Sequence, residues 1–135
     1  RDIMRWLPLV LAACLAAPLQ AASLRDIRLN DTLKQVAEQS NENTPRAISA
    51  QITDMGFSAD GDELINRLAV DADYAELMQQ DPLLTRSQLQ ASVCTDLRFR
   101  RLLDMGATLT YHFILKDSEQ PVLTQSFIAD HCQTL

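Results

Sequence analysis

One stretch of the chain alternates strictly between two kinds of side chain. In residues 108–115, every second position is a large apolar or aromatic residue: Leu109, Tyr111, Phe113 and Leu115. The positions between them are mostly polar. A period of two is the side-chain period of a β-strand, so this stretch predicts a strand with one apolar face. The chain must therefore build a sheet.

Three further stretches predict strands. Residues 51–57 and 63–70 flank the segment Ser58-Ala59-Asp60-Gly61-Asp62, which is the strongest turn signal in the chain, and together they predict a hairpin. Residues 122–128 follow a short turn after the strand at 108–115 and predict its hairpin partner.

Residues 45–57 also allow a helix. Thr44-Pro45 is a good helix start, and Ile48, Ile52 and Met55 have helical spacing. We choose the strand and keep the helix as the alternative.

Helical spacing and capping residues predict four helices. They begin at Asn30 or Asp31, at Ala72, at Asp81-Pro82 and at Thr95 or Asp96, and end near residues 40, 80, 93 and 105. Gly106 is a typical C-terminal stop. Two hairpins separated by helices predict an α+β fold, with a four-stranded antiparallel sheet and helices on one face.

Residues 1–21 have the pattern of a signal peptide. Arg5 precedes an apolar run, residues 6–17, that is too short to span a bilayer, and small residues follow it. The favoured cut lies after Ala21, with Ala22 as the alternative, and a buried N-terminal helix is the competing interpretation. Residues 22–135 then form a single exported domain, periplasmic or secreted, with no membrane span.

The same segment could instead be the signal of a lipoprotein. Leu11-Ala12-Ala13-Cys14 has the form of a lipobox, in which Cys14 would carry the lipid and become the first residue. Only five apolar residues separate Arg5 from Leu11, which is shorter than the usual apolar region of about 7–15 residues. We therefore do not expect lipidation at Cys14.

The net negative charge of the chain limits which partners it can bind. The chain has 12 basic and 18 acidic side chains, and removing residues 1–21 leaves 10 and 17, a net charge of −7. The sequence pI near 4.7 argues against binding to nucleic acid, which needs a basic face.

Two cysteines remain after export, Cys94 and Cys132. In an oxidising compartment they have only each other, which predicts a disulfide. A reactive thiol is the alternative, but the chain has no CxxC motif.

No catalytic, metal or cofactor site is predicted. His112 and His131 lack further ligands at metal spacing, and Asp60-Gly61-Asp62-Glu63 departs from a calcium-loop pattern after its first positions. We interpret these residues as surface histidines and a solvated turn, and we expect a protein that is not an enzyme.

Two features could bind a partner. Arg98, Arg100 and Arg101 form a basic cluster, in which Arg98 and Arg101 share a helix face and could dock an acidic partner; a solvated face is the simpler interpretation. Tyr111 and Phe113 are expected in the core, with a ligand groove along the sheet as the alternative.

The segment from Val93 to Phe113 resembles a signature of small exported bacterial proteins. Cys94 precedes a helix that ends in Leu102-Leu103 and Gly106, and a Thr-Leu-x-Tyr strand follows. Residues 22–40 and 86–111 are similar, more narrowly, to the putative quorum-sensing-regulated virulence factor family of pseudomonads. That resemblance implies an exported α+β domain linked to virulence, and it supplies no catalytic residues.

A looser likeness is to disulfide-bonded pilotins, which escort secretin subunits to the outer membrane and are usually lipidated. The expected function is therefore a non-catalytic binding protein with an unknown protein or peptide partner. A pilotin-like secretion accessory is the first alternative, and a small hydrolase or inhibitor is the second.

Overall fold

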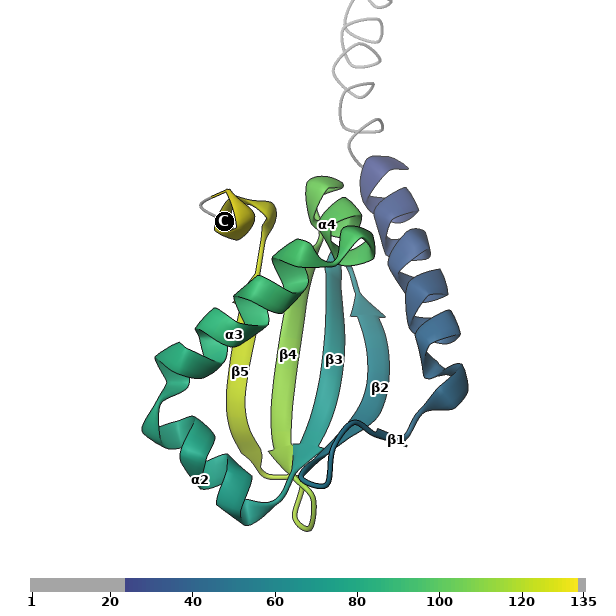
Figure 1. Ribbon diagram of the computed structural model, residues 1–135. Coiled ribbons are helices and arrows are strands. Elements are labelled where there is room, and N and C mark those ends of the chain that lie inside the picture. Colours follow the sequence, from purple (N-terminus) through teal and green to yellow (C-terminus); the bar gives the residue numbers. More distant parts are fainter. Residues whose placement is uncertain (1–23, 134–135) are drawn as a thin grey trace, which may run out of the picture.

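A sheet of five strands runs through the part of the chain that the computed structural model describes, residues 24–133 (Figure 1). Its strands, in spatial order, are β1 (Arg46–Ala47), β2 (Ile52–Asp60), β3 (Glu63–Val70), β4 (Thr108–Leu115) and β5 (Pro121–Phe127). The pairs β2/β3 and β4/β5 are the two predicted hairpins, but β3 and β4 run parallel. The α+β class is confirmed, whereas the prediction of four antiparallel strands is wrong in number and in direction.

The parallel pair follows from what lies between its strands. Three helices connect the end of β3 to the start of β4: α2 (Ala72–Gln80), α3 (Pro82–Thr95) and α4 (Leu97–Asp104). A crossover of a dozen or more residues is what two parallel strands need, and this connection supplies it. The fifth strand, β1, comes from the segment for which a helix was the alternative. That helix does not form.

Three of the predicted helix starts are confirmed. Asp71, Asp81 and Asp96 each accept a hydrogen bond from a backbone N–H in the first turn of α2, α3 and α4. The predicted start at Asn30 or Asp31 is wrong, because residues 24–40 are all helical. Leu29 belongs to the same buried stripe as Leu33, so the apolar face begins earlier than the capping signal indicated.

The N-terminal helix (residues 24–40) and the short 3₁₀ turn that follows it are joined to β2 by one side chain. The Oδ1 atom of Asn41 accepts from the N–H of Phe57 at 2.6 Å, and its Nδ2 donates to the carbonyl of Phe57 at 2.8 Å. Gly56 makes this approach possible, because a Cβ there would lie 2.8 Å from Asn41 Oδ1.

All the helices of the described chain lie on one face of the sheet (Figure 1), where two apolar clusters form. The closed cluster lies under the N-terminal helix, α3 and α4: Leu29, Leu33, Ala37, Leu64, Val93, Cys94, Leu102, Leu103, Ala107, Leu109, Phe127 and Cys132. The open cluster lies beside α2: Leu68, Val70, Ala75, Met78 and Phe113.

Candidate functional site

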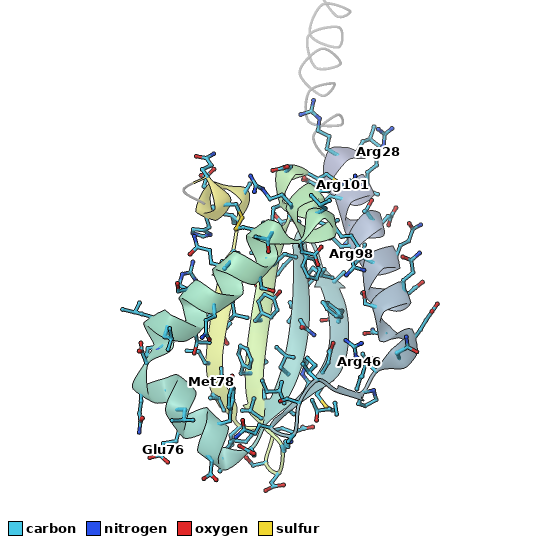
Figure 2. All side chains as sticks on the ribbon, in the orientation of Figure 1. Arg28, Arg46, Glu76, Met78, Arg98 and Arg101 are labelled. Atoms are coloured by element: carbon cyan, nitrogen blue, oxygen red, sulfur yellow. A yellow bond between two sulfur atoms is a disulfide. The ribbon has the colours of Figure 1, made fainter. Side chains whose placement is uncertain are left out.

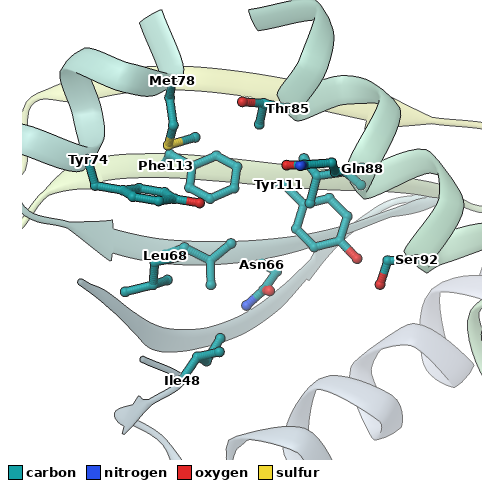
Figure 3. A pocket seen from close by; sticks show the side chains of 12 residues that line it. Ile48, Asn66, Leu68, Tyr74, Met78, Thr85, Gln88, Ser92, Tyr111 and Phe113 are labelled. Carbon is teal, nitrogen blue, oxygen red and sulfur yellow. The ribbon is translucent and has the colours of Figure 1, made fainter. Parts of the chain in front are cut away.

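A groove of about 300 Å³ opens above the open cluster, between α2 and α3 on one side and the segment around β1 on the other. Figure 3 shows side chains from the sheet floor and from both helices turned toward it. The lining residues are Ile48, Ile52, Asn66, Leu68, Tyr74, Met78, Thr85, Gln88, Leu89, Ser92, Tyr111 and Phe113.

The floor of the groove is largely apolar. Leu68 on β3 pairs with Phe113 on β4, so both side chains stand on the helix-covered face. Tyr74 and Met78 lie four residues apart on α2 and therefore reach the floor from the same helix face. Ile48 forms the opposite rim and is 54% exposed. Both predictions for Phe113 therefore apply: its side chain is buried in the core, and it also lines a groove along the sheet.

The α3 wall is polar. Thr85, Gln88 and Ser92 are spaced by three and four residues, so they line one edge of the helix. Their side chains make no hydrogen bond to any other residue that the structure describes. Polar groups on a wall above an apolar floor leave hydrogen-bonding capacity for something placed in the groove.

The hydroxyl of Tyr111 lies at the Ser92 end of the groove (Figure 3). Burial, together with smaller contributions from the carboxylates of Asp96 and Asp54, raises the pKa of Tyr111 to about 12. The hydroxyl is therefore uncharged at neutral pH and can donate or accept a hydrogen bond.

A buried carboxylate holds the groove's amide in place. Asp54 is only 6% exposed, and its Oδ1 accepts from the N–H of Gly56 at 2.9 Å and from Nδ2 of Asn66 at 2.8 Å. These bonds fix the orientation of Asn66, which faces the groove.

The predicted arginine site lies elsewhere. Figure 2 places Arg98 and Arg101 with Arg28 at the end of the molecule where α4 meets the N-terminal helix, outside the groove lining. The Arg98 side chain is 83% exposed, and its guanidinium lies 3.7 Å from the carboxylate of Asp96.

The two cysteines form the predicted disulfide. Their Cα atoms lie 5.3 Å apart, and the bridge ties the short C-terminal 3₁₀ turn η2 (Ala129–Cys132) to the end of α3. Both sulfurs lie within the closed cluster. The alternative of a reactive thiol is therefore not the arrangement found. Cys14 lies outside the described residues.

The two histidines and the acidic turn do not come together in one site. His112 bonds Thr124 through Nδ1 at 2.9 Å, whereas Nδ1 of His131 accepts from the N–H of Ile128 at 2.9 Å. Within residues 24–133, no three His, Cys, Asp or Glu side chains gather where they could hold a metal ion. Nor is any helix in that range long and apolar enough to cross a membrane.

A family profile described as putative quorum-sensing-regulated virulence factor matches residues 22–133. The chain belongs to this family. A crystal structure of a putative secreted protein from Pseudomonas aeruginosa is 44% identical to it, with a TM-score of 0.80 over 82% of this chain and 97% of that one. No match is found among curated proteins.

Two solved pilotins of type II secretion systems share the fold of this family member. The Vibrio vulnificus pilotin has a TM-score of 0.69 at 18% identity, covering 82% of this chain and 97% of its own. The Vibrio cholerae pilotin has a TM-score of 0.62 at 14% identity, covering 83% and 99%. At these identities the likeness concerns the fold.

Sequence reasoning named Tyr111 and Phe113 but missed most of the groove. Ile48, Met78 and the polar edge of α3 were not singled out. Thr85, Gln88 and Ser92 gave no signal, because polar residues along one edge are what any solvent-exposed helix carries.

Proposed function

We propose that this family member is an exported, non-catalytic binding protein whose groove holds an apolar segment of a protein partner. The observation that carries the proposal is the groove itself, which has an apolar floor, a polar wall and an open side. Leu68 and Phe113 supply apolar contact area, while Gln88 and Ser92 can hydrogen-bond the polar groups that a peptide segment brings with it.

An exported location is supported by the 44% identical relative, which is described as a putative secreted protein. We place this protein in the periplasm or outside the cell. The absence of catalysis is part of the proposal, and it is supported by the groove's composition: hydroxyl, amide and aromatic groups line it, with neither a histidine nor a carboxylate among them.

A pilotin-like role is the second candidate. Its support is the fold shared with two pilotins, together with the position of the groove between helices and sheet. Under this candidate the partner is a secretin subunit, and the protein acts at the outer membrane.

A photo-cross-linking pair tests the proposal. A benzophenone amino acid replaces Gln88 on the groove wall in one variant and Ser87, exposed on the far side of α3, in the other. Both are expressed in the native host. A partner that cross-links from position 88 and not from position 87 is expected. Equal labelling from both positions, or none from position 88, contradicts a groove-binding function.

Two further observations separate the candidates. If the partner is identified by mass spectrometry as a secretin subunit, the pilotin-like role is supported; any other exported protein favours the general binding role. The intact mass of the exported protein then reports its anchoring. A chain that begins at Ala22 is expected for a free domain, and a lipidated Cys14 for an anchored one.

A further inference from the structure

We propose that the segment held in the groove is amphipathic and carries Lys or Arg side chains at the end that lies along α2. This inference rests on the proposed function, since it specifies what the groove recognises. It is carried by the charge and the exposed apolar side chains of the α2 wall.

The outer surface of α2, next to the groove lining, is acidic. Residues 71–85 contain four carboxylates and neither Lys nor Arg. Asp71 and Asp81 cap α2 and α3 with their side chains. Asp73 and Glu76 are exposed, and among the residues that the structure describes neither forms an ion pair.

Helix geometry places Asp73 nearer the groove than Glu76, on the outer edge of α2 beside Leu77. Tyr74 lines the groove, and Leu77 lies one turn beyond it on the same edge of α2. Asp73 is four residues from Leu77 and shares that edge. Glu76 is two residues from Tyr74, which places it on the opposite side of the helix. A cation that lies just outside the groove, next to Leu77, therefore meets Asp73 before Glu76.

The same edge extends the apolar surface. Leu77 is 59% exposed and Leu84, one turn before Gln88 on α3, is 54% exposed. Ile48 faces them across the groove with a similar exposure. Exposed apolar side chains that continue a groove indicate contact with a partner. An occupant that covers them next to Asp73 combines an apolar face with a basic flank.

The cations near the groove do not neutralise this wall. Lys116 donates to the carbonyl of Ala50 at 3.4 Å, so its ammonium group is engaged with the β1 side. Arg46 lies opposite Asp54 in the β1/β2 register, on the far rim. Arg98 and Arg101 lie at the α4 end of the molecule (Figure 2). Asp73 and Glu76 therefore keep their negative charge at the α2 end of the groove, which favours a basic flank on the occupant there.

Synthetic peptides of one apolar pattern test the inference. Three peptides carry the same leucine repeat with flanking Lys, Gln or Glu, and each is titrated into the isotope-labelled protein, residues 22–135, while groove resonances are followed by NMR. The Lys peptide is expected to bind tightest and the Glu peptide weakest. Ser92→Trp, which fills the groove, is expected to abolish binding, while Ser87→Trp on the far side of α3 leaves it unchanged.

A matched pair of charge variants locates the contact. Asp73→Asn is expected to weaken binding of the Lys peptide about threefold, the size of an exposed ion pair, and Glu76→Gln to weaken it less. The Gln peptide is expected to bind both variants as it binds the native protein. Raising the salt concentration is expected to reduce the Lys preference.

The outcomes distinguish a failure of the basic flank from a failure of groove binding. If the Glu or Gln peptide binds the groove as tightly as the Lys peptide, or if Asp73→Asn and Glu76→Gln are equal, the basic flank is overturned while groove binding stands. If no peptide shifts the groove resonances, or if Ser92→Trp leaves binding intact, groove binding itself is contradicted and the inference falls with it.

Discussion

The two apolar clusters use the same strands but are covered differently. Leu64 and Leu109 of the closed cluster lie on β3 and β4, only a few residues from Leu68 and Phe113 of the open cluster. Helices and the disulfide-linked tail seal the first pair. The second pair is covered from one side by α2 and faces the groove on the other.

This difference shows that helix placement divides the sheet face into core and binding surface. The strand residues are equally apolar at both ends, so strand composition does not mark the groove. What marks it is the lack of a helix above the start of β2 and the end of β3 (Figure 1), whereas Phe57 and Ala59 farther along β2 pack against the closed cluster. Stability is therefore expected to reside mostly at the closed end, and partner contacts at the open end.

Of the changes proposed here, removing the disulfide is expected to lower the free energy of unfolding most. The double variant Cys94→Ser and Cys132→Ser opens a loop with a sequence separation of 38, for which the chain-entropy estimate is about 4 kcal/mol in the free energy of unfolding. Urea denaturation measures the loss. The native protein in strong reductant serves as the control and is expected to match the variant. No change on reduction would mean that the closed end does not depend on the bridge.

A pair of identical truncations compares the two regions directly. Leu103→Ala removes a fully buried side chain of the closed cluster and is expected to cost about 3 kcal/mol, because it leaves a cavity. Leu84→Ala at the groove rim is expected to cost less than about 0.5 kcal/mol. The same denaturation experiment measures both. Similar losses would show that the rim is packed as tightly as the core, contrary to the comparison.

Tyr111 packs against both the closed and the open cluster, and an alkaline titration of stability tests how deeply its hydroxyl is buried. A tyrosine in the unfolded chain loses its proton near pH 10, whereas Tyr111 in the folded protein keeps it until about pH 12. Above pH 10 the unfolded state therefore binds fewer protons, and the free energy of unfolding falls by about 2 kcal/mol between pH 10 and pH 12.

The variant Tyr111→Phe isolates this contribution, because it removes the phenol and keeps the ring. Its free energy of unfolding is expected to fall less between pH 10 and pH 12 than that of the native protein. Identical slopes for the two proteins would show that the Tyr111 hydroxyl is more hydrated than its place in the groove indicates.

Local patterns predicted the elements that depend on local physics. The alternation in residues 108–115 gave β4, and Asp60-Gly61 gave the hairpin turn between β2 and β3. The caps at Asp81 and Asp96 gave the starts of two helices, and the start at Ala72 was predicted without its cap, Asp71. Each of these signals concerns hydrogen bonds or side-chain positions within a few residues.

Pairing between distant segments was harder to predict. The helices between β3 and β4 satisfy the length of a parallel crossover, yet two antiparallel hairpins with intervening helices also permit an all-antiparallel sheet. β1 has only two paired residues, Arg46 and Ala47, which is too short for any alternation to be visible. Asn30 looked like a helix cap, but its side chain instead donates to the carbonyl of Gly61 across the fold.

The sequence by itself determined the class of fold, the hairpin partners, most helix starts and the pairing of Cys94 with Cys132. These features follow from side-chain periodicity, from backbone hydrogen bonding near chain turns and from the two cysteines that follow the predicted signal peptide. The tertiary structure alone decided the parallel direction of β4, the fifth strand and the groove. These depend on how the helices pack over the sheet, since the same apolar strand face becomes core or surface according to what covers it.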